Sequence, residues 1–132
     1  AKVLGELGNN AAFVVHGHNG LDELTTTGKN RVSHLKDGKV NTFEFDPQTL
    51  GFSKPADISD LKGGTPDDNA KIMRDLLSGQ RNGALKDVVL LNAAAAIAAD
   101  SGDIANGLVE AKKSLESGAA LAKLEALIAL SS

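Results

Sequence analysis

The chain has 132 residues, of which 42% are hydrophobic and 23% charged, a composition typical of one folded globular domain. Its net charge is −3, its Lys and Arg residues are scattered, and it has neither Trp nor Tyr, so we do not expect a nucleic-acid partner. The absence of cysteine excludes disulfides and fits a reducing cytoplasm. The sequence contains no run of about 18 apolar residues, so we do not expect a membrane-spanning helix.

The first residues have the pattern of a helix end followed by a buried strand. Residues 1–8 have helical spacing and end at Gly8, a residue type that often follows a helix. Residues 11–17, AAFVVHG, form a short apolar run with β-branched side chains, which is typical of a buried strand in a parallel sheet. The abrupt start, without a helix-capping residue, suggests part of a longer protein, although a complete small domain could also begin in this way.

A hairpin is predicted over residues 31–45, where two strand-like runs flank Asp37-Gly38. Asp-Gly accepts the positive φ angles that both central positions of a type I′ turn require. Asp46-Pro47 then ends the second strand and can begin a short helical turn. Because an antiparallel hairpin would lie beside a parallel strand, the sequence predicts a mixed sheet.

The second half of the chain is expected to be helical. Thr65 can cap a helix whose first residue is Pro66 and which ends at Gly79. Three further helices are expected over residues 85–100, 104–117 and 119–130, with Asp103 as the cap of the second. The predicted fold is therefore α/β, a mixed sheet with flanking helices.

Asp22 and Glu23 are the residues most suggestive of chemistry. They closely follow the predicted strand, and ligands in open α/β sheets bind beyond the carboxyl ends of the strands. Mg²⁺ is typically held by one or two carboxylates together with substrate phosphates. Judged by spacing alone, the favoured alternative is that two acids simply begin a helical turn, stabilised by its dipole.

Other polar residues have mostly structural interpretations. His16 and His18 could share a metal, but no third ligand lies near, so exposed or hydrogen-bonded histidines are favoured, and His34 is interpreted as a surface strand residue. The hydroxyls of residues 25–27 could bind phosphate, although threonine is also common at the start of a strand. Asn92, within an apolar helix, is predicted to link that helix to a neighbouring backbone.

The segment VVHGHNGLDEL, residues 14–24, closely resembles the anthranilate phosphoribosyltransferases, which carry a Gly-Leu-Asp-Glu signature after a core strand. The resemblance extends over nearly the whole chain. Further matching segments follow in the family's order: Thr26-Thr27-Gly28, Arg31-Val32, Asp46-Pro47, Leu50-Gly51, Leu61-Lys62-Gly63-Gly64, Asn69-Ala70, Leu90-Leu91-Asn92-Ala93-Ala94-Ala95-Ala96 and Ser117-Gly118-Ala119-Ala120.

The resemblance implies a catalytic domain of the nucleoside phosphorylase and phosphoribosyltransferase type. Enzymes of this family transfer the phosphoribosyl group of phosphoribosyl diphosphate to anthranilate and release diphosphate, a step of tryptophan biosynthesis. They need magnesium and usually form homodimers through an N-terminal helical domain. By resemblance, Asp22 and Glu23 would hold Mg²⁺ on the diphosphate.

Several features of the family are missing from this sequence. Neither the glycine-rich Gly-Thr-Gly-Gly-Asp loop nor the Lys-His-Gly-Asn segment is present, and Asn19 stands where the family often has Asp. We therefore expect residues 1–132 to be the C-terminal part of the catalytic domain, inactive alone. The alternatives are a pyrimidine nucleoside phosphorylase of the same fold, or a non-catalytic relative that acts as a binding protein.

Overall fold

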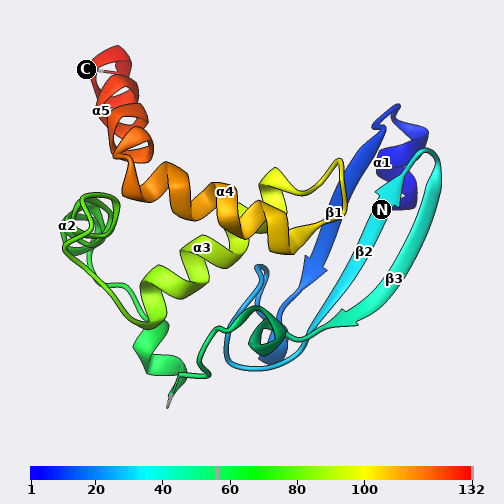
Figure 1. Ribbon diagram of the computed structural model, residues 1–132, viewed down its shortest axis with the longest axis horizontal. Coiled ribbons are helices and arrows are strands. Elements are labelled where there is room, and N and C mark those ends of the chain that lie inside the picture. The colour runs from blue at the N-terminus through cyan, green and yellow to red at the C-terminus, as the bar shows by residue number, and fades with distance from the viewer. Residues whose placement is uncertain (56, 132) are drawn as a thin grey trace.

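The computed structural model describes residues 1–55 and 57–131 and has a sheet at one side, with helices packed in the middle and at the other side (Figure 1). The strands are β1 (Ala11–His16), β2 (Asn30–Lys36) and β3 (Lys39–Phe45). The helices are α1 (Lys2–Glu6), α2 (Pro66–Leu77), α3 (Ala84–Ile97), α4 (Ile104–Glu116) and α5 (Ala119–Ser131). Short 3-10 turns are η1 (His18–Gly20), η2 (Pro47–Leu50) and η3 (Ile58–Leu61). This arrangement confirms the α/β class.

The three strands form one sheet in the order β1-β2-β3, and both pairings are antiparallel. Asp37 and Gly38 join β2 to β3 with φ angles of 47° and 75°, so the predicted type I′ turn is confirmed. Val32 of β2, which is fully buried, pairs with Val15 on one side and Phe43 on the other. These side chains belong to the face of the sheet that packs against the helices.

The prediction of a mixed sheet with a parallel strand is wrong for the described residues. The loop after β1 brings the chain back beside β1, so β2 runs in the opposite direction instead of crossing over to a parallel position. β1 is also only partly buried: Phe13 and Val15 pack against the core, whereas Val14 is 39% exposed. Its apolar run therefore belongs to an antiparallel strand with one exposed face.

The helix ends follow the sequence signals closely. The Thr65 side chain accepts a hydrogen bond from the Asp68 N–H, and the Asp68 side chain accepts one from the Thr65 N–H, so α2 begins with a capping box. The Asp103 side chain accepts from the Asn106 N–H at the start of α4. No residue of α5 is buried; this helix turns away from α4 and is joined to α2 by the Arg74–Glu125 ion pair (Figure 1).

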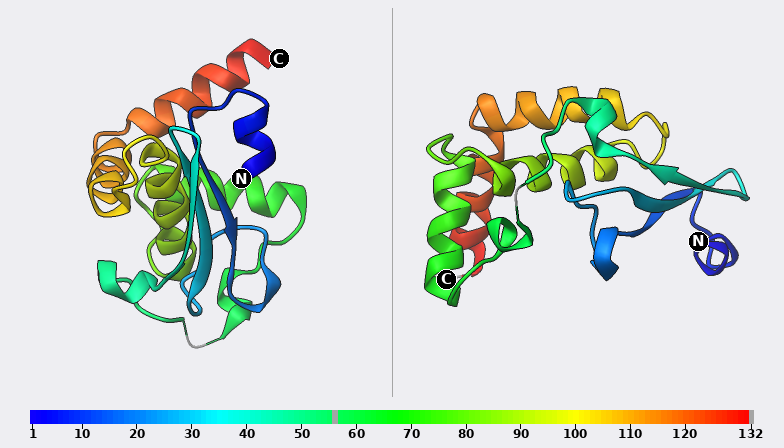
Figure 2. Two further views of the ribbon diagram at one scale, coloured as in Figure 1. Left: turned by 90° about the vertical axis from the view of Figure 1, so that its right-hand side faces the viewer. Right: turned by 90° about the horizontal axis from the view of Figure 1, so that it is seen from below.

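The core lies between the sheet and the helices α3 and α4, which pack against each other (Figures 1 and 2). Leu91 and Ala94 of α3 are fully buried. A Cβ atom on Gly107 of α4 would lie 2.3 Å from the Ala94 carbonyl oxygen, so α4 approaches the backbone of α3 as closely as glycine allows. None of the described helices is long and apolar enough to cross a membrane.

Candidate functional site

The loop between β1 and β2 contains the acidic pair and is closed by its own backbone. Just after β1, the Gly17 N–H donates to the Leu21 carbonyl at 2.8 Å, and the Gly20 N–H donates to the Gly17 carbonyl at 3.2 Å. A Cβ atom on Gly17 would lie 2.2 Å from the carbonyl oxygen of Glu23. Only glycine at position 17 therefore allows the backbone of the acidic pair to pass this close to the end of the strand.

Asp22 and Glu23 are both exposed, and neither carboxylate forms a hydrogen bond or ion pair with any other residue in the described ranges. Their oxygens are free to bind a ligand. Within residues 1–55 and 57–131 there is no group of three or more His, Asp or Glu side chains placed to hold a metal. Two free carboxylates without a third protein ligand suit Mg²⁺, which keeps several waters and binds substrate phosphates at its other positions.

The backbone directly after the acidic pair is held by two asparagine side chains. Asn92 of α3 accepts from the Leu24 N–H at 2.9 Å and donates to the Leu24 carbonyl at 2.7 Å. Asn30, at the start of β2, does the same for Thr25, at 2.9 and 3.0 Å. The predicted link between Asn92 and a neighbouring backbone is confirmed. The role of Asn30 gave no signal in the sequence, because asparagine before a strand usually indicates only a turn.

The three threonines of this loop are buried rather than presented to solvent. Thr25, Thr26 and Thr27 are 0, 1 and 6% exposed. The hydroxyls of Thr25 and Thr27 lie 3.0 Å apart and bond each other. These side chains pack beneath the loop that leads into β2, which favours the structural interpretation over phosphate binding.

The three histidines differ in their exposure and contacts. His16 and His18 are exposed, and the His18 ring covers Gly28, where a Cβ atom would meet the ring at 2.6 Å. The interpretation of His34 as a surface residue is wrong. Its ring packs against Phe13, with centroids 4.4 Å apart and ring planes tilted by 39°. Its Nε2 lies 2.9 Å from the Ala99 carbonyl oxygen, which connects β2 to the segment after α3.

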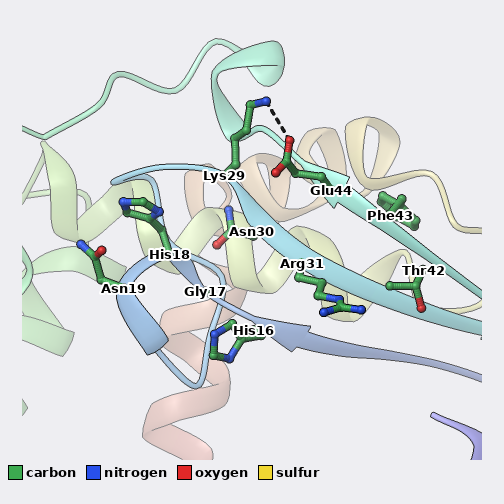
Figure 3. Close-up of a pocket in the computed structure, with 10 residues that line it drawn as sticks. All are labelled: His16, Gly17, His18, Asn19, Lys29, Asn30, Arg31, Thr42, Phe43 and Glu44. Atoms are coloured by element: carbon green, nitrogen blue, oxygen red, sulfur yellow. Dashed lines mark hydrogen bonds and ion pairs between the residues drawn. The ribbon is translucent and has the colours of Figure 1, made fainter.

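A pocket of about 530 Å³ lies where the loop after β1 meets β2 and β3 (Figure 3). His16, His18 and Arg31 contribute nitrogen-bearing side chains to its lining. Lys29 donates to Glu44 at 2.7 Å, and this hydrogen bond, together with the negative charge, raises the pKa of Lys29 above its ordinary 10.5. Asp22 and Glu23 belong to the same loop but do not line this pocket.

Relatives of similar sequence include anthranilate phosphoribosyltransferases. The chain is 48% identical over 131 residues to an anthranilate phosphoribosyltransferase from Moorella thermoacetica, covering 98% of this chain and 38% of the relative. It is 50% identical over 133 residues to one from Methanocorpusculum labreanum, covering 99% of this chain and 38% of the relative. The chain thus spans less than two fifths of the length of these curated relatives.

Solved structures of the same enzyme share the fold. The anthranilate phosphoribosyltransferase of Thermus thermophilus superimposes with a TM-score of 0.82 at 38% identity, covering 96% of this chain and 37% of that one. The Saccharomyces cerevisiae enzyme in complex with PRPP and Mg gives a TM-score of 0.78 at 31% identity, covering 87% of this chain and 33% of that one. These matches confirm the resemblance inferred from the Gly-Leu-Asp-Glu signature.

A family model also matches most of the chain. The glycosyl transferase family, a/b domain, matches residues 1–121, which include the sheet, the loop with the acidic pair and the helices α2, α3 and α4. The chain therefore belongs to the glycosyl transferase family, as part of its a/b domain.

Proposed function

We propose that the protein to which this chain belongs transfers the phosphoribosyl group of phosphoribosyl diphosphate to anthranilate, giving N-(5-phosphoribosyl)anthranilate and diphosphate for tryptophan biosynthesis. The observation that carries this proposal is the similarity, at about half of all positions, to proteins named anthranilate phosphoribosyltransferase. It favours this reaction over a nucleoside phosphorylase or a non-catalytic binding role. We also propose a cytoplasmic homodimer for the full-length protein, to be tested by fractionation and by sedimentation.

We propose further that Asp22 and Glu23 bind the magnesium ion of this reaction. Both carboxylates are exposed, adjacent and unpaired with other described residues, and the related yeast structure contains PRPP and Mg. When bound, magnesium stabilises the negative charge that develops on the departing diphosphate. The two carboxylates would hold the ion on the diphosphate, and the hydrogen bonds of Leu21 and Leu24 would hold the backbone that carries them.

The chain alone does not supply a complete site by this proposal. Two carboxylates are too few to bind both a diphosphate and anthranilate, and the chain spans 38% of the length of its relatives. The remaining contacts would come from the rest of the full-length protein. Residues 1–132 alone should therefore leave anthranilate unchanged.

The test is loss of anthranilate fluorescence in the presence of phosphoribosyl diphosphate across a Mg²⁺ titration, with the full-length protein. Asp22→Asn combined with Glu23→Gln removes both charges and keeps the shapes. We expect turnover to fall by roughly 100-fold or more, because metal binding stabilises the transition state by several kcal/mol and each 1.4 kcal/mol is a factor of about ten.

The matched control is Asp67→Asn combined with Glu116→Gln, which removes the same two charges from exposed positions on α2 and α4. The control should keep wild-type turnover and Mg²⁺ dependence. Unchanged turnover of the Asp22 and Glu23 variant at every Mg²⁺ concentration would refute the metal role, and no turnover by the wild-type full-length protein would refute the reaction.

A further inference from the structure

The acidic pair lies between two fixed points of the backbone. On its N-terminal side, the Leu21 carbonyl accepts from the Gly17 N–H. On its C-terminal side, the N–H and the carbonyl of Leu24 both bond to Asn92. Only Asp22 and Glu23 span the distance between these points, and two residues reach at most about 7 Å. The positions of the two carboxylates therefore depend on where Leu24 is held.

Asn92 is well suited to hold Leu24 in one position. Besides its two bonds to Leu24, its side-chain amide donates to the Val88 carbonyl one turn earlier in α3, at 2.9 Å. This third bond fixes the orientation of the amide group, so its acceptor and donor face Leu24 together. α3 is itself held in the core by Leu91, which is fully buried, and by the close packing of Ala94 against α4.

We propose that Asn92 is a positioning residue for the magnesium site, which sets the placement of the Asp22 and Glu23 carboxylates through the main chain of Leu24. This inference rests on the metal role proposed above for the acidic pair. Asn92 would act through the main chain and not as a metal ligand, because its side-chain hydrogen bonds go to the backbone of Leu24 and Val88. Asn92 links α3, which is held in the core, to Leu24 in the loop that carries Asp22 and Glu23, although Asn92 and Leu24 are 68 residues apart in sequence.

The chain contains a matched comparison for this role. The Asn69 side chain accepts from the Gly64 N–H at 2.8 Å and donates to the Gly64 carbonyl at 3.2 Å, the same pair of bonds to one residue. Asn69 lies on α2, on the far side of α3 from the sheet and the loop after β1 (Figure 1). Losing its bonds should affect local stability but not the acidic pair.

The experiment uses the full-length protein and measures the half-saturating Mg²⁺ concentration in two ways. One is the rise in melting temperature caused by phosphoribosyl diphosphate at increasing Mg²⁺, and the other is turnover. The variants are Asn92→Ala, Asn92→Asp, which keeps the shape and the acceptor for the Leu24 N–H, and Asn69→Ala. Far-UV circular dichroism identifies the variants that fold. If Asn92→Ala does not fold, the test is made with Asn92→Asp.

We expect the Asn92 variants to need roughly 10- to 100-fold more Mg²⁺ by both measures, the range for groups that orient metal ligands. Asn69→Ala should melt lower with no change in Mg²⁺ requirement. The inference is overturned if the Asn92 variants are less stable but have the wild-type half-saturating Mg²⁺ concentration, while the combined Asp22→Asn and Glu23→Gln variant has a higher one. If the acidic variant is also unchanged, the metal site itself is refuted and this inference with it.

Discussion

Replacing Gly17 by alanine tests whether the close approach inside the loop after β1 controls the acidic pair. Gly17 has a φ of −75° and a ψ of 160°, which alanine adopts readily, so the substitution introduces no backbone strain of its own. The new methyl group would instead lie 2.2 Å from the Glu23 carbonyl oxygen and 3.0 Å from the Leu21 Cβ. Either the Glu23 backbone or the end of β1 must then move.

The size of the effect follows from this contact. Ordinary contacts begin at 3.4 Å, so the Glu23 oxygen must retreat by more than 1 Å. Overpacking of this kind costs about 1–3 kcal/mol, of which alanine recovers about 0.4–1 kcal/mol through a less flexible unfolded chain. A displacement of about 1 Å at a catalytic group lowers turnover by roughly 100-fold, so the loss of activity should exceed the loss of stability.

The assay is turnover of anthranilate by the full-length Gly17→Ala protein across a Mg²⁺ titration, together with a thermal melt. Gly20→Ala is the control in the same loop, because a Cβ there meets nothing within 4 Å and only the φ of 82° is unfavourable. Gly20→Ala should lower the melting temperature without raising the Mg²⁺ requirement. A folded Gly17→Ala protein with wild-type turnover and Mg²⁺ dependence would refute the reasoning.

Two further predictions concern stability and pH. Gly107→Ala should destabilise the protein by about 1–3 kcal/mol, because its methyl group would lie 2.3 Å from the Ala94 carbonyl oxygen and would push α4 away from α3. An unchanged midpoint of urea unfolding would contradict this prediction. The pKa of Asp68 is below its ordinary 3.8 because its carboxylate accepts hydrogen bonds from the Thr65 hydroxyl and N–H. This depressed pKa contributes stability above pH 3.8 that is lost on further acidification, and Thr65→Ala should raise the Asp68 pKa measured by carboxyl NMR.

Structural features set by neighbouring residues were predictable from the sequence. The Asp37-Gly38 turn, the Thr65 cap of α2 and the Asp103 cap of α4 each depend on bonds between residues within about four positions of one another. Asn92 was also predictable, although its partner is distant, because a partly buried amide in an apolar helix needs a backbone partner. Its partner, Leu24, could not be named from the sequence.

Features set by distant packing were not predictable. The direction of β1 relative to β2 depends on how the loop of residues 17–29 folds back, and the apolar run of β1 fits either direction. The partial burial of His34 results from its contact with the Ala99 carbonyl, which the sequence does not bring close. The exposure of Asp22 and Glu23 agrees with their predicted role, whereas the approach of Gly17 to Glu23 emerged only from the backbone geometry.

The separation of 68 residues between Leu24 and Asn92 also has a consequence for protein synthesis. A ribosome adds about 5–20 residues per second, so roughly 3–14 s pass between the two residues. During that time the hairpin of β2 and β3 can form, because its contacts are local, but the Leu24 amide has no partner on α3. In stalled nascent chains, hydrogen exchange at the Leu24 amide should therefore remain fast until α3 has emerged. Exchange in the β2–β3 hairpin should slow earlier, in shorter chains.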